Sequence, residues 1–441
     1  MNILSRFING FLLFITSSAL WLTAVTKIIW LPVPLAILYL AINIVPNIRN
    51  YKISSFRLRN CLEGADLLFS FLTASTLSLI LHYVLFLILI PDDYLLWIFS
   101  ALFAFITLGI VFVNGILRVY LTSIQLGIKY RLLGIFLGWI PVLNITALIF
   151  IISITTKEVE FEYNKILLNK ERESQQICRT KYPILLVHGV FFRDSKTLNY
   201  WGRIPQELIK NGATIYYGNH QSALSVKESG IEIAERIQKI VKETGCEKVN
   251  IIAHSKGGLD CRYAISCLGA DKYVASLTTI NTPHRGCLFA DYLLDIATDR
   301  FKQRVAKKYN SAYKALGDEN PDFLSAVWDL TDEKCHQFNK EVLDKNGILY
   351  QSVGTKLNNA TSGRFPLNLS YSLVKHFDGD NDGLVGKESF PWGSNYTYIT
   401  VNGKRGVSHA DIIDLHRENI TNFDVREFYV QLVSDLKSRG L

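Results

Sequence analysis

The chain has 441 residues, more than one ordinary domain needs, and 49% of them are hydrophobic. Its mean hydropathy of +0.18 is rarely reached by a soluble protein of this length, so part of the chain is expected to lie in lipid. The formal net charge is +8, but residues 156–441 are nearly balanced, with 38 basic and 35 acidic side chains. This balance of charges does not indicate nucleic-acid binding.

Residues 1–155 are predicted to form a transmembrane region. Apolar runs of about 20 residues, the length that crosses a bilayer, recur there with very few charges. We expect five helices from these runs, near residues 7–26, 29–47, 64–90, 95–117 and 132–154. The protein is therefore expected to be an integral membrane protein.

The charges between these runs predict an orientation. The loops after the second and fourth runs are basic, whereas Asp92 and Asp93 follow the third run. The positive-inside rule places the two basic loops in the cytoplasm. Five spans then place the C-terminal domain on the extracytoplasmic side, although Lys157, Lys165 and Lys170 after the last run favour a cytoplasmic exit.

Residues 156–180 mix both signs of charge and predict a helical linker to a domain that covers residues 181–441. Strand and helix patterns alternate in this domain, with helices expected near residues 201–211 and 227–243. Strands are expected at residues 184–187, 214–217, 248–253, 273–280, 348–353 and 396–401. The repeated β-α-β order predicts an α/β fold, with a mostly parallel sheet and helices on both faces.

The strongest chemical signal is AHSKGG at residues 253–258, where a buried strand pattern ends. A nucleophile elbow needs a strand, a serine and a helix, with small side chains two positions before and after the serine. Ala253 and Gly257 meet this need, although the usual pattern has glycine at the first position. Ser255 is the candidate nucleophile, and the backbone N–H of Lys256 is a candidate oxyanion donor. The alternative is a strand–helix turn that merely contains a serine.

A serine nucleophile needs a base and an orienting acid, in the chain order Ser, acid, His for this arrangement. His409 is favoured as the base because it lies in a loop just before a predicted helix. His416 falls inside that helix, and His376 precedes the acids. Asp382, within DGDNDGLV at residues 378–385, is favoured as the acid because its turn is expected to lead away from a strand end. A solvated acidic turn or a calcium loop is the alternative for this run, although its spacing is not that of an EF-hand.

A second oxyanion donor is expected after the first strand of the domain. The sequence His188-Gly189-Val190 follows that strand, and Gly189 lets the backbone turn closely. The N–H of Val190 is therefore the second candidate donor.

The domain resembles bacterial triacylglycerol lipases of the Pseudomonas/Burkholderia type over nearly all of the chain after the linker. The matching stretches are His188-Gly189, Tyr200-Trp201-Gly202, Arg262-Tyr263 and residues 253–258, 282–286, 381–385 and 408–411. The resemblance implies an α/β-hydrolase fold and supports Ser255, Asp382 and His409 as the triad. Together with the apolar runs before residue 155, it places the protein in a bacterial cell membrane as an expectation. It also implies a helical lid at residues 288–330, for which a plain surface helix is the alternative.

Two departures from that family bear on cofactors and substrate. Those lipases hold a structural calcium, and Asp411 matches one ligand, but Leu415 stands where a Gln would be and residues 359–372 offer no Asp. No cofactor is therefore expected, and calcium is a disfavoured alternative. The family is secreted as soluble enzyme, so the membrane region argues against its bulk-oil substrate.

The function expected from the sequence is a membrane-anchored serine hydrolase, a lipase or esterase that cleaves carboxylic esters of lipids. Its partners would be a lipid or acyl-ester substrate and the membrane, without nucleic acid. An acyltransferase on the same triad is the second hypothesis, and a hydrolase-fold membrane protein without catalysis is the third. The seven cysteines include no C-x-x-C pair, so zinc is not expected, and most should be buried thiols, with one or two disulfides left open.

Overall fold

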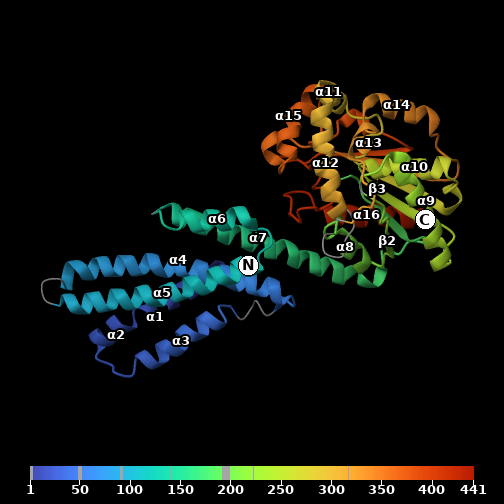
Figure 1. Cartoon of the computed structure of the whole chain (residues 1–441). Coiled ribbons are helices and arrows are strands. Elements are labelled where there is room, and N and C mark those ends of the chain that lie inside the picture. Colours follow the sequence, from blue (N-terminus) through green and yellow to red (C-terminus); the bar gives the residue numbers. More distant parts are fainter. Residues whose placement is uncertain are drawn as a thin grey trace. The chain divides into compact units, whose positions relative to one another are not determined.

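A computed structural model describes residues 3–47, 52–89, 93–140, 142–190, 199–221, 223–315 and 317–441. The chain divides into two compact units, Met1–Leu168 and Asn169–Leu441 (Figure 1). The boundary falls within one long helix, α7 (Leu143–Arg172). Residues 156–172 of the predicted helical linker are thus the C-terminal half of α7.

The described part of the N-terminal unit is helical. Its other helices are α1 (Ile3–Ser17), α2 (Ala19–Thr26), α3 (Pro32–Ile44), α4 (Phe56–Leu89), α5 (Tyr94–Thr122) and α6 (Gly127–Leu137). The two longest, α4 and α5, lie side by side, and α1 packs against α4 (Figure 1). A small apolar core that includes Leu13, Leu67 and Val111 joins these three helices.

Two described helices are long and apolar enough to cross a membrane, Phe56–Ile88 and Tyr94–Thr122. A third span is present if α1 and α2, which bend by 61° at their junction, cross together. The described residues thus give two or three candidate spans by length and composition, and the expected five stay a prediction. The run at residues 29–47 gives only the 13 residues of α3, about 20 Å of helix, against a hydrocarbon core of roughly 30 Å. The run at residues 132–154 is divided between α6 and α7.

Buried ion pairs hold the helices of this unit together. Arg6 lies 2.7 Å from Asp66, and Arg57 lies 2.6 Å from Glu158. Glu158 is 2% exposed, belongs to the part of α7 that the sequence assigned to the linker, and accepts backbone N–H groups after α5. The N-terminal unit therefore extends into the predicted linker. The side of the membrane on which the second unit lies stays a prediction.

The C-terminal unit contains one sheet of six parallel strands in the order β2-β1-β3-β4-β5-β6. The strands are β1 (Ile184–Val187), β2 (Ile215–Tyr217), β3 (Val249–His254), β4 (Val274–Ile280), β5 (Leu349–Thr355) and β6 (Asn395–Ile399). Each lies within two residues of its predicted position, and the α/β-hydrolase fold class is confirmed.

Helices cover both faces of this sheet, as the side-chain alternation of β1 shows. Ile184 and Leu186 join the core beneath α8 (Ile204–Lys210) and α16 (Val425–Ser438). Leu185 and Val187 join the opposite core, beneath α9 (Val226–Thr244) and α10 (Lys256–Cys267). All four side chains are fully buried, which explains why the strand is a continuous apolar run.

Five further helices lie in the two connections that follow β4 and β5. They are α11 (Leu288–Ile296), α12 (Asp299–Ala315), α13 (Phe323–Trp328), α14 (Asp332–Glu341) and α15 (Leu367–Asp378). The first three occupy the predicted lid segment, and α11 lies beside α15 (Figure 1). All seven cysteines fall within the described residues and are free thiols, so the disulfides that the sequence left open are not formed.

Candidate active site

The backbone at Ser255 is strained where β3 ends and α10 begins. Ser255 has φ 56° and ψ −134°, a region that residues other than glycine rarely adopt. Its N–H donates to the carbonyl of Ile280 at 2.9 Å, and the Thr282 hydroxyl donates to its carbonyl at 2.7 Å. These contacts hold the sharp strand–helix turn that the sequence predicted at this serine.

Two glycines let the segment after β1 approach this turn. A Cβ on Gly257 would lie 2.4 Å from the carbonyl oxygen of His188, and a Cβ on Gly189 would lie 2.7 Å from the Cβ of Ser255. Neither position leaves room for a side chain. Of the two residues predicted to supply oxyanion donors, Lys256 directly follows Ser255, and Val190 directly follows Gly189 and is 7% exposed.

The carboxylate of Asp382 is fully buried and accepts four hydrogen bonds. The backbone N–H groups of Leu384 and Val385 donate to Oδ1 at 2.9 and 2.8 Å. The other oxygen, Oδ2, lies 2.7 Å from the Asn281 side-chain nitrogen and 2.6 Å from Nδ1 of His409. The His409 backbone N–H also donates to the Asp382 carbonyl at 2.9 Å. The imidazole is thus fixed through Nδ1, and Nε2 is the ring nitrogen that can accept a proton.

His254 connects this pair to the serine turn. Its ring centroid lies 4.5 Å from that of His409, and it directly precedes Ser255. Burial, followed by the nearby His409, lowers the pKa of His254 well below its usual value, so this imidazole is neutral. The structure therefore brings Ser255, His409 and Asp382 to the same edge of the sheet.

Two expectations about the surroundings of these residues were wrong. Asp382 follows helix α15, rather than a strand end. His416 lies in a succession of turns that runs from residue 409 to 416, rather than inside a helix. Of the three histidines considered, it is His409 that contacts the buried carboxylate.

Two polar residues of the site received no role from the sequence. The Tyr200 hydroxyl accepts the Gly189 N–H at 3.1 Å and lies 2.6 Å from Nδ1 of His254, so it joins the segment after β1 to the serine turn. Asn281 directly follows β4 and holds Asp382. Its position directly after a predicted strand could have marked it as a site residue, because the carboxyl ends of parallel strands meet at one edge of a sheet and often carry such residues.

The side chain of Lys256 makes a buried ion pair that the sequence did not reveal. Its ammonium lies 2.6 Å from Oδ1 of Asp260 and 3.0 Å from the Ser229 hydroxyl. Both charged side chains are at most 2% exposed. Burial raises the pKa of the Asp260 carboxyl from 3.8 to about 7, although Lys256 lowers it. The pair fixes the first turn of the helix that follows the serine.

We expect Lys256→Met, which keeps the backbone N–H, to reduce the free energy of unfolding by about 3–5 kcal/mol, because Asp260 loses its buried partner. The double variant Lys256→Met/Asp260→Leu should recover part of that loss.

The folded pKa of Asp260 exceeds its unfolded value, so the folded state binds the extra proton and the free energy of unfolding of the wild-type chain falls as pH rises from about 4 to 7. Chemical unfolding of the detergent-solubilised chain measures each effect. Solvent-exposed ion pairs contribute up to about 1 kcal/mol, so a smaller loss of unfolding free energy in Lys256→Met would contradict a buried pair.

The residues around Asp411 do not fit a calcium ion. The guanidinium of Arg405 donates to Asp411 Oδ1 at 3.0 Å and also bonds Glu418. The second oxygen of Asp411 accepts the Ser408 N–H at 3.1 Å. The positive charge beside Asp411 is thus a guanidinium, and the described residues hold no cluster of three or more metal-binding side chains.

Chelation by EDTA should therefore leave the esterase activity expected from the sequence unchanged, whereas Arg405→Gln should lower it several-fold. The guanidinium braces residues 408–411, which include His409, so its loss should loosen the imidazole. Arg439→Gln is the matched control, because Arg439 pairs with Asp435 on an exposed part of α16's C-terminal end. Loss of activity on chelation that added calcium restores would contradict this account.

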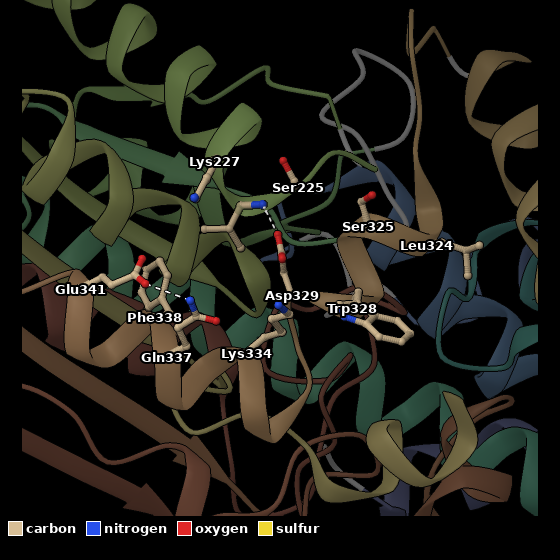
Figure 2. A pocket seen from close by; sticks show the side chains of 11 residues that line it. Ser225, Lys227, Leu324, Ser325, Trp328, Asp329, Lys334, Gln337, Phe338 and Glu341 are labelled. Carbon is tan, nitrogen blue, oxygen red and sulfur yellow. Dashed lines mark hydrogen bonds between the residues drawn. The ribbon is translucent and has the colours of Figure 1, made fainter. Parts of the chain in front are cut away.

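A surface pocket of about 440 Å³ lies between the start of α9 and helices α13 and α14 (Figure 2). The Val226 N–H donates to Asp329 at 2.6 Å across it, and Lys227, Trp328 and Glu341 contribute to its walls. None of the five predicted site residues lines this pocket. Ser255 and His409 are only 7% and 8% exposed, so the predicted chemistry lies in a closed part of the unit.

No family model matches the chain. A triacylglycerol lipase of Pseudarthrobacter phenanthrenivorans and one of Burkholderia plantarii are each 39% identical to it over 122 residues, 26% of this chain. These matches span 38% and 34% of the relatives' own lengths. A triacylglycerol lipase of Vibrio cholerae is 28% identical over 292 residues, 60% of this chain and 91% of the relative. The C-terminal unit thus has an α/β-hydrolase fold and is similar in sequence to triacylglycerol lipases.

Solved structures with a similar arrangement include the mature form of a Bacillus licheniformis lipase, with a TM-score of 0.42 and 22% identity. That match covers 58% of this chain and 92% of the lipase. Lipase 1 of Pelosinus fermentans has a TM-score of 0.44 and 19% identity, and the match covers 58% of this chain and 99% of that lipase.

Proposed function

We propose that this protein is a membrane-anchored serine hydrolase that cleaves carboxylic esters of lipids. The observation that carries the proposal is the buried pair of Asp382 and His409 beside a strained serine at a strand–helix turn. A nucleophile, a base and an orienting acid at one edge of the sheet are the groups that acyl transfer through a serine requires.

In the proposed mechanism, the Ser255 hydroxyl attacks the ester carbonyl carbon while Nε2 of His409 takes its proton. The backbone N–H groups of Val190 and Lys256 hold the oxyanion, and losing one such donor typically lowers the rate by roughly a hundredfold to a thousandfold. His409 then gives the proton to the departing alcohol, which leaves an acyl-enzyme. Water activated by His409 attacks the acyl-enzyme and releases the acid, while Asp382 keeps the imidazole oriented throughout.

Two observations support a lipid ester as the substrate. The relatives are named for hydrolysis of triacylglycerol. The two or three long apolar helices would keep the site near acyl esters of a bilayer. A water-soluble ester would give the membrane helices no evident purpose, so esters of membrane lipids suit the whole chain best.

Helices α11–α13 are proposed to form the lid. Ser255 is nearly inaccessible, so a lipid ester needs a segment that moves before it can reach the hydroxyl. Helix α11 carries exposed apolar side chains, among them Tyr292 and Ile296, at 43% and 59% exposure. Such side chains would contact lipid when the lid opens.

We expect Ser255→Ala to lower hydrolysis of p-nitrophenyl butyrate by membranes containing the protein at least roughly a thousandfold. The fold should survive, because the change removes one oxygen atom, and an unchanged unfolding temperature would verify this. Ser438→Ala is the control, since its hydroxyl only bonds a carbonyl of its own exposed helix end. Turnover that persists in Ser255→Ala would refute the mechanism.

The same assay separates hydrolysis from acyl transfer when an alcohol is added. Free acid as the main product supports the hydrolase. A new ester formed in preference to acid would assign the acyl-enzyme to an acyltransferase and would contradict the proposed reaction, but not the triad.

A further inference from the structure

Helix α12, which Figure 1 labels within the proposed lid, is strongly basic in sequence. Its 17 residues include six lysine or arginine residues and a single acid, Asp299. Five of the six cations are exposed, namely Arg300, Arg304, Lys307, Lys308 and Lys314. At 3.6 residues per turn, these five side chains fall within an arc of about 120°. They define what we call the basic face of α12.

The opposite face of α12 is already used for packing within the unit. Ala306 and Tyr313 are buried at 5% and 3% exposure. The Tyr309 ring stacks on Phe323 of α13 with centroids 4.4 Å apart, and Val305 packs against the same cluster. The orientation of the helix is therefore fixed by its apolar residues, and the basic face points away from the packed cluster.

Within the described residues, none of the five cations of the basic face forms an ion pair. The sixth cation, Lys302, differs, because its ammonium lies 3.5 Å from Asp299 and 6.0 Å from the Trp328 ring centroid. Like charges three or four residues apart on a helix, such as those of Arg304 and Lys308, repel one another. A helix that is otherwise well packed thus retains a repulsive charge arrangement, and a polyanionic surface would relieve it.

The carboxylates of the lid do not provide this relief because several bond backbone groups. Asp291 accepts the Asp332 N–H at 2.8 Å. Asp322 caps α13 by accepting the Ser325 N–H at 3.2 Å. These two acids therefore compensate helix ends, and the single acid of α12, Asp299, lies beside Lys302 rather than beside the basic face.

Exposed apolar side chains adjoin the basic face. Phe301, on the flank of α12, is 56% exposed, and Ile296, at the end of α11, is 59% exposed. Cations beside aromatic and aliphatic side chains are typical of helices that lie on anionic bilayers, where lysine and arginine contact headgroups and apolar groups enter the interface. Nucleic acid would match the charges but would leave these apolar side chains in water.

We propose that the basic face of α12, with Phe301 and Ile296, docks the lid on a bilayer rich in anionic phospholipid. The inference rests on the proposed function only for the name of the lid, since neither the charges nor the docking depends on the triad. According to this inference, the lid binds a bilayer with anionic headgroups better than a neutral bilayer.

The test uses the full chain carrying Ser255→Ala, reconstituted in phosphatidylcholine nanodiscs and mixed with separate vesicles. The vesicles are pure phosphatidylcholine or contain roughly a third phosphatidylglycerol, which brings anionic lipid to the docking surface. We expect the protein to float with the anionic vesicles, and the amount that floats with neutral vesicles to be lower by at least roughly tenfold. High salt should release the protein, because it shortens the Debye length.

Replacing all five residues of the basic face by glutamine should abolish flotation with anionic vesicles. The matched control removes the same charge from exposed sites elsewhere in the unit, by glutamine at Lys239, Lys242, Lys272, Lys340 and Lys345, and should still float. An unchanged unfolding temperature would show that both variants fold.

Several outcomes would overturn the inference. These are equal flotation with neutral and anionic vesicles, salt-insensitive flotation, equal loss in both variants, or binding to RNA in place of anionic vesicles. Because the chain tested is already inactive, failure of the docking and failure of the hydrolase mechanism remain distinguishable.

Discussion

The site depends on one backbone constraint, the left-handed φ of Ser255 between β3 and α10. A non-glycine residue holds such a conformation only where its surroundings determine it. Here the Ile280 carbonyl, the Thr282 hydroxyl and the close approach of Gly189 do so. The parallel order of the sheet then brings the segments that follow neighbouring strands to the same edge, where Asn281 meets Asp382.

Local patterns predicted the strands and the strand–helix turn at Ser255, because each depends on residues near one another in sequence. What the sequence could not show were contacts between distant residues. Tyr200, for example, joins two segments of the site that are 11 and 54 residues from it in the sequence. Lys256 and Asp260 are only four residues apart on α10, a spacing at which opposite charges pair on a helix, so the sequence hid the burial of this pair rather than the pairing. Hydropathy marks an apolar run without showing the breaks within it, such as the division between α6 and α7, so the sequence and the structure give different counts of candidate spans.

The lid and the N-terminal unit differ in how their charged side chains are compensated. Apolar residues on one face of α12 bind the helix to its own unit, which leaves its charges and the exposed Phe301 for an outside surface. Buried carboxylates such as Glu158 neutralise arginines in the N-terminal unit, whereas the basic face of α12 keeps its charge uncompensated within the described residues. In the proposed account, the first arrangement anchors the chain and the second positions the lid.

The central claim is that His409, oriented by Asp382, activates Ser255. Labelling of membranes with a fluorophosphonate probe tests it most directly, because the probe reacts with an activated serine. The account predicts labelling of the wild-type chain, no labelling of Ser255→Ala and strongly reduced labelling of His409→Ala. Labelling that persists without Ser255, or a wild-type chain that stays unlabelled even when detergent opens the lid, would contradict it.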